Sequence, residues 1–150
     1  MVLVQGAMSI WSFTRRIPIA PERRGYFHRL VDNELVRGPI VTTWSSHDGA
    51  LRRFYPVAAG LARDMTVAVT GYPQYGALGA FGARGSGVNA QPRALTLGDL
   101  TSDHGLVPGQ VYNVNGNAVI RSGGGLSGAH SDIAHPEVGH LFWNAVLAAP

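Results

Sequence analysis

The chain has 150 residues, of which 45% are hydrophobic and 14% charged, and its formal net charge is +3. This length and composition predict a single globular domain with a buried core and exclude a disordered protein. All 12 basic residues are arginines. They are scattered rather than gathered into a run, so we expect no nucleic-acid partner.

Cysteine is absent from the sequence. Its absence excludes disulfides, a thiolate nucleophile and cysteine-based zinc sites. No apolar run approaches the length of a membrane span, and the first residues lack the basic and apolar regions of a signal peptide. We therefore expect a cytoplasmic protein with no membrane partner.

Three short segments rich in β-branched or aromatic residues predict strands, over residues 2–4, 40–44 and 111–114. The segment 40–44 is apolar or β-branched at almost every position, which is typical of parallel strands covered on both faces. A turn signal at residues 115–116 predicts that 111–114 forms a hairpin with 118–120.

Two segments have apolar residues at helical spacing. Over residues 51–62, Pro56 indicates that the regular helix begins near Tyr55, after a tighter turn. Over residues 136–146, Pro136 suits the first helical position. The second helix has an apolar stripe that we expect to be buried, made of Val138, Leu141, Phe142, Ala145 and Val146.

Two further stretches, 11–37 and 71–109, have little periodicity and predict loops, with a hint of order at 94–97. Along the whole chain, strands alternate with helices. This order predicts an α/β fold, with a mainly parallel sheet and flanking helices.

Two side chains suited to acid–base chemistry follow predicted strands. Asp48 comes just after residues 40–44, and His130 lies in a glycine-rich loop after residues 111–114. Functional groups of open α/β sheets gather beyond the carboxyl ends of the strands. A carboxylate that accepts from an imidazole fixes its tautomer and leaves the other nitrogen as a base. The alternative is that Asp48 only caps the next helix and His130 is a solvated loop residue.

The segments around these two side chains resemble the C-terminal half of an α/β-hydrolase. Residues 128–137, GAHSDIAHPE, resemble the histidine loop of that family, and residues 38–48, GPIVTTWSSHD, resemble its acid-bearing strand and turn. On this resemblance Asp48 matches the triad acid, His130 matches the general base, and residues 2–7 match the strand after the nucleophile helix. The resemblance implies serine-hydrolase type hydrolysis of an ester or amide, with a small acyl substrate and no cofactor.

The nucleophile of that family lies in a Gly-x-Ser-x-Gly elbow before the acid. No such motif precedes Asp48, and no oxyanion-hole segment is found. Ser127 lies only three residues from His130, too near for in-line proton transfer, so we interpret it as a loop residue. We therefore expect residues 1–150 to form a single, partial α/β-hydrolase-like domain that a nucleophile-bearing segment completes.

The alternative function is that of a non-catalytic, truncated remnant or interaction module of the same fold. An open sheet edge, left by missing strands, would favour self-association or binding to a partner half.

A metal site is a further alternative, because four side chains with ligand chemistry lie close in sequence: His130, Asp132, His135 and His140. However, His135 and His140 are five positions apart, which turns them away from each other on a helix, and HExxH spacing is absent. Glycine-rich stretches fit neither the P-loop nor the dinucleotide fingerprint. We therefore expect no metal and no cofactor.

Overall fold

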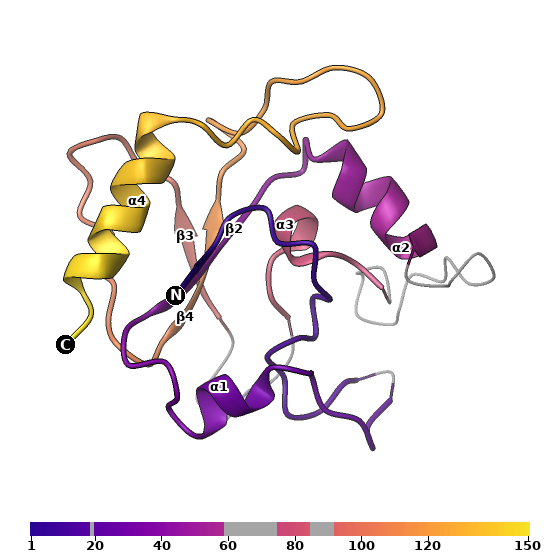
Figure 1. The fold of residues 1–150 in the computed structure, drawn as a ribbon, viewed down its shortest axis with the longest axis vertical. Helices are drawn as coiled ribbons and strands as arrows, with labels where there is room; N and C mark the ends of the chain where they lie inside the picture. The colour runs from indigo at the N-terminus through magenta and orange to yellow at the C-terminus, as the bar shows by residue number, and fades with distance from the viewer. Residues whose placement is uncertain (19, 59–74, 85–91) are drawn as a thin grey trace.

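A parallel β-sheet forms the centre of the structure (Figure 1). The computed structural model describes residues 1–18, 20–58, 75–84 and 92–150. Within these residues, one four-stranded sheet has the order β1-β2-β4-β3. Each neighbouring pair of strands is parallel, which confirms the predicted α/β class with a parallel sheet. The strands are β1 (Val2–Leu3), β2 (Ile40–Trp44), β3 (Arg93–Thr96) and β4 (Val111–Asn115).

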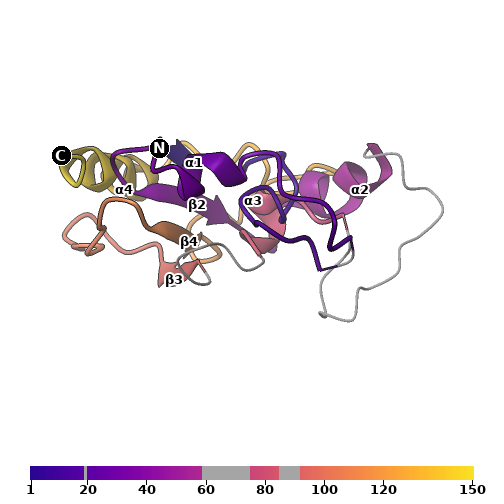
Figure 2. The ribbon, with the colours of Figure 1, turned by 90° about the horizontal axis from the view of Figure 1, so that it is seen from below.

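Helices cover both faces of the sheet. The described helices are α1 (His28–Asp32), α2 (Tyr55–Ala58), α3 (Leu78–Phe81) and α4 (Pro136–Leu147), and a π-helical turn, η1 (Ala50–Phe54), leads directly into α2. Figures 1 and 2 show α4 on one side of the sheet and α3 on the other, with α2 farther from the strands, beyond α3. None of these helices has the length and apolar character needed to cross a membrane.

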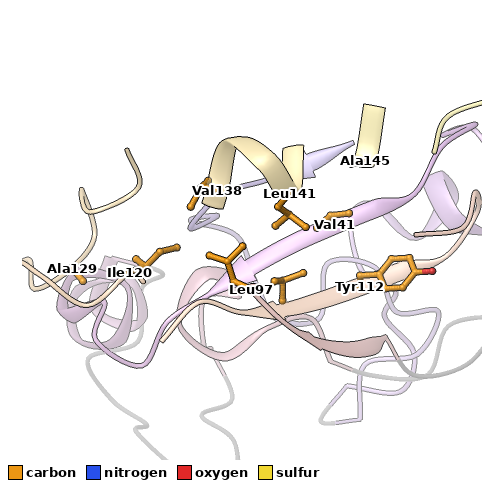
Figure 3. Packing of buried hydrophobic residues seen from close by; sticks show 9 residues of the cluster. Val41, Leu97, Tyr112, Ile120, Ala129, Val138, Leu141 and Ala145 are labelled. Atoms are coloured by element: carbon orange, nitrogen blue, oxygen red, sulfur yellow. The ribbon is translucent and has the colours of Figure 1, made fainter. Parts of the chain in front are cut away.

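The two faces of the sheet have separate cores. On the α4 side, Val41 of β2 and Tyr112 of β4 belong to one buried cluster with Leu141 of α4 (Figure 3). On the other side, Ile40 packs with Leu78 of α3. Because β2 is covered on both faces, both of its alternating sets of side chains are buried.

The apolar stripe of α4 is buried only in part. Val138, Leu141 and Ala145 are buried against the sheet, as the spacing predicts. Phe142 and Val146 are about half exposed, so the prediction that the whole stripe is buried is wrong. Phe142 and Val146 lie beside β1, a two-residue edge strand, and the described sheet has no further strand on that side to cover them.

The turn before α2 also differs from its prediction. The regular helix does begin at Tyr55, but the preceding turn is wider rather than tighter, since the Tyr55 N–H donates to the carbonyl of Ala50, five residues back. A proline ring clashes with the carbonyl four residues earlier, here that of Arg52, and this excludes regular α geometry before Pro56. The chain widens into a π turn instead. Residues 59–62 of the predicted helix lie outside the described residues.

The predicted hairpin does not form. β4 pairs with β2 on one side and with β3 on the other, which leaves no free edge for residues 118–120. The chain turns instead at Gly116, whose carbonyl accepts the N–H groups of both Val119 and Ile120.

Short elements lie in the two stretches predicted as loops. α1 has five residues and α3 has four, and apolar periodicity is not detectable over so few positions. The hint of order at 94–97 corresponds to β3, which pairs in parallel with β4. Part of the second stretch, residues 71–74 and 85–91, lies outside the described residues.

Candidate acid–base site at the carboxyl edge of the sheet

Asp48 and His130 meet beyond the carboxyl ends of the strands. The turn after β2 carries Asp48, and the loop between β4 and α4 reaches back across this edge of the sheet to carry His130 (Figure 1). Asp48 Oδ2 lies 2.9 Å from His130 Nδ1. The Asp48 side chain is 0% exposed and the His130 side chain 38% exposed. The pair therefore consists of a buried acid and a histidine at the surface.

The carboxylate determines which imidazole nitrogen carries the proton. A carboxylate only accepts hydrogen bonds, so His130 Nδ1 donates in this contact. Nε2 is then the nitrogen with the free lone pair, and it has no hydrogen-bond partner among the described residues. This is the arrangement that a general base requires.

The two oxygens of Asp48 have different partners. Oδ2 binds His130, whereas Oδ1 accepts a hydrogen bond of 2.8 Å from the Leu51 backbone N–H. Asp48 therefore caps the start of the following helical segment and also contacts the histidine, so it does more than the capping that the alternative assigned to it. A buried carboxylate is costly unless its oxygens are hydrogen-bonded, and here both are.

Backbone hydrogen bonds join the two loops next to the pair. The Ala129 N–H donates to the His47 carbonyl at 2.9 Å, and the Ala50 N–H donates to the Ser127 carbonyl at 3.1 Å. At Gly128, φ is +56° and a Cβ would collide with the His47 carbonyl oxygen. Only glycine allows the loops to approach this closely.

A second carboxylate, that of Asp132, fixes the ends of the His130 loop. Asp132 Oδ2 accepts from the N–H groups of Ser122 at 2.7 Å and Arg121 at 2.9 Å, and Oδ1 lies 2.8 Å from His135 Nε2. The Ser122 N–H, followed by the His135 ring and the Arg121 N–H, lowers the pKa of Asp132 from its ordinary value. Asp132 therefore stays ionised to a lower pH than an ordinary aspartate.

The side chains considered as metal ligands have other partners. His130 binds its carboxylate, Asp132 and His135 bind each other, and His140 Nε2 lies 2.9 Å from the Ser102 carbonyl oxygen. In the described ranges, no three His, Asp or Glu side chains gather in a group that would hold a metal ion.

No described serine is hydrogen-bonded to His130 through its hydroxyl. Ser45 is buried, and its Oγ donates to the Ile120 carbonyl at 2.6 Å. Ser46 Oγ lies 3.2 Å from an asparagine side chain. Ser127 contacts His130 only through the backbone, its carbonyl accepting the His130 N–H at 3.3 Å. The site thus contains an acid and a base without a described nucleophile.

Sequence reasoning missed a polar hollow beside the pair. The hollow has a volume of about 490 Å³ and includes the side chains of His47, Arg52 and Arg53 in its lining. In the sequence, the two arginines look like the solvent-facing side of an amphipathic helix. Their pattern therefore does not distinguish them as residues that line a binding site. Their position directly after a strand and its turn is the one feature of the sequence that points to this edge of the sheet.

Comparisons of the chain with protein-family models, with curated proteins and with solved structures found no match. The structure establishes a parallel α/β fold, and kinship with the α/β-hydrolases stays a prediction. Roles for Asp48 and His130 therefore depend on their geometry and chemistry alone.

The substitution Gly128→Ala is expected to separate Asp48 from His130, whereas Gly125→Ala is not. Both glycines have positive φ, +56° and +64°, but a Cβ would meet the backbone only at Gly128, with nothing within 4 Å at Gly125. The free energy of unfolding of each variant should be about 1–2 kcal/mol lower than that of the wild type, because alanine is strained in the left-handed conformation. The free energy of unfolding should fall further in Gly128→Ala, because its Cβ also collides with the backbone. This variant should also change the imidazole NMR signals of His130. Equal losses in urea unfolding, with unchanged signals in both variants, would contradict this account.

Proposed function

We propose that this chain supplies the acid and the general base for serine-hydrolase type hydrolysis of an ester or amide with a small acyl group. The observation that carries this proposal is the Asp48–His130 pair, a fully buried carboxylate 2.9 Å from Nδ1 of a partly exposed histidine. The carboxylate stabilises the imidazolium that forms when Nε2 takes a proton.

The reaction follows from the free lone pair on His130 Nε2. Nε2 takes the proton of a hydroxyl nucleophile as that hydroxyl attacks the carbonyl carbon, and it then gives the proton to the leaving oxygen or nitrogen. A water molecule then attacks the acylated nucleophile in the same way, with Nε2 as its base, and this releases the carboxylic acid. Asp48 keeps its negative charge throughout and holds the imidazole in position.

In this proposal, the nucleophile is a serine on a polypeptide segment that is not part of this sequence. No Gly-x-Ser-x-Gly motif precedes Asp48, and no described hydroxyl hydrogen-bonds to His130 Nε2. The resemblance of residues 38–48 and 128–137 to the C-terminal half of an α/β-hydrolase supports the same inference, because that family places its nucleophile elbow before the acid.

His130→Ala is expected to remove the chain's ability to accelerate hydrolysis of an activated ester such as p-nitrophenyl acetate. A positioned general base contributes about 10²–10⁴-fold to a rate, and water serves as the nucleophile in this assay. His28→Ala is the matched control, because His28 lies on α1 and its ring contacts the Gly25 carbonyl instead. Equal rates for the wild type and the His130→Ala variant would refute the general-base role.

A fluorophosphonate probe tests the origin of the nucleophile in the same samples. The proposal predicts that the intact mass of the chain alone does not change on exposure to the probe. Stoichiometric labelling that depends on His130 would show that the chain carries its own nucleophile, and the external serine would then be excluded.

A second candidate function is association through the β1 edge, and a specific surface favours it. β1 is an edge strand of the described sheet, and Phe142, Trp143, Val146 and Leu147 of the neighbouring α4 are all exposed. An apolar hollow of about 230 Å³ lies between them, with Met1, Val2, Phe142 and Val146 in its lining. Exposed apolar surface next to an open strand edge favours protein–protein association.

Under this second candidate, the native mass of the chain should increase with concentration to that of a dimer, and Phe142→Asp should restore the monomer. Leu100→Asp is the control, since Leu100 is also exposed but lies outside the lining of this hollow. A monomer at every concentration would exclude self-association through this edge.

A further inference from the structure

The polar hollow beside the acid–base pair has the features of a binding site. Its volume of about 490 Å³ lies within the range of small-molecule sites. Three segments line it: the turn after β2, η1 and the glycine-rich loop that leads to His130. Its lining includes Ser46, Gly49, Arg52, Arg53, Gly125 and Gly128, and none of the lining residues is acidic.

The hollow adjoins the acid–base pair through the backbone. Gly49 follows Asp48 directly in the chain, and Gly128 is bridged to Asp48 across the two loops. The carboxylate of Asp48 does not line the hollow, since its side chain is 0% exposed and its two oxygens are bonded to Leu51 and His130. The charged side chains that a ligand in the hollow would meet are those of Arg52 and Arg53.

Arg52 is held in place before any ligand binds. Its Nη1 donates to the Ser46 carbonyl at 3.1 Å, and its guanidinium carbon lies 5.4 Å from the centre of the Phe81 ring. The second contact is a cation–π interaction, which restrains the side chain further. An arginine that is already ordered loses less conformational entropy when it binds an anion.

Arg53 adds a second positive charge, and η1 brings the two arginines to the same hollow. Neither arginine forms an ion pair with a described carboxylate. Single π-helical turns are rare, and they occur frequently at functional sites. Here the π turn begins two residues after Asp48. It donates the Leu51 N–H to Asp48 and places Arg52 and Arg53 in the lining of the hollow.

We propose that this hollow binds the oxyanion group, a carboxylate or a phosphate, of a small organic ligand. Arginine recognises both groups through paired, charge-assisted hydrogen bonds. The binding site itself does not depend on catalysis. The assignment of a substrate class, an anionic acyl compound, does rest on the proposed function.

Titration with inorganic phosphate, followed by backbone amide NMR, tests the site directly. A parallel titration uses acetate, and chloride holds the ionic strength constant in both. Saturable shifts should be confined to the lining, with Gly125, Gly128 and Ser46 among the responding amides. The stronger of the two responses identifies the oxyanion that the site prefers, and no saturable response to either anion would overturn the proposal.

The double variant Arg52→Gln/Arg53→Gln should weaken this binding by about tenfold or more, because charge-assisted hydrogen bonds are lost. Arg37→Gln/Arg93→Gln is the matched control. It removes the same charge from two exposed arginines, which lie near the amino ends of β2 and β3. Equal weakening by both double variants would show non-specific attraction and refute the site.

Arg52→Lys separates charge from geometry, since lysine keeps the charge but not the paired donors. We expect it to bind more weakly than the wild type and more tightly than Arg52→Gln. The same titration of His130→Ala should match the wild type. Retained phosphate binding without His130-dependent ester hydrolysis would refute the proposed function only, and the reverse result would refute the anion site only.

Discussion

The carboxylate of Asp48 connects the fold to its candidate chemistry. It is fully buried, and its two oxygens bind a helix start through the Leu51 N–H and a loop through His130. Removing either partner would leave part of a charge without compensation in the protein interior, at a large free-energy cost. The carboxylate therefore links the turn after β2, the beginning of η1 and the loop before α4, in addition to the backbone hydrogen bonds that join the two loops.

The parallel sheet explains why residues 82 positions apart in sequence meet at this point. β2 and β4 are neighbours that run in the same direction, so the segments that follow them leave the sheet side by side. Glycine then permits the final approach, since a side chain at Gly128 would collide with the His47 carbonyl. The same approach forms the lining of the arginine-bearing hollow, so acid–base chemistry and anion binding would share one scaffold.

Sequence reasoning predicted the elements whose pattern is long or strongly apolar. β2 and the start of α4 lie where β-branched residues and Pro136 indicate, and Asp48 and His130 follow from their places after strands. The short helices α1 and α3 gave no periodic signal. The hairpin prediction failed because a local turn signal cannot show that β4 already has two strand partners. The hollow was missed because Arg52 and Arg53 look like a solvated helix face.

The most direct test of this account is the tautomer of His130, measured from the imidazole nitrogen shifts by NMR at a pH where the ring is neutral. The account predicts a hydrogen-bonded proton on Nδ1 and an unprotonated Nε2, and it predicts that Asp48→Asn mixes the two tautomers. A proton on Nε2 in the wild type, or spectra that Asp48→Asn does not change, would contradict the claim that Asp48 prepares His130 as a base.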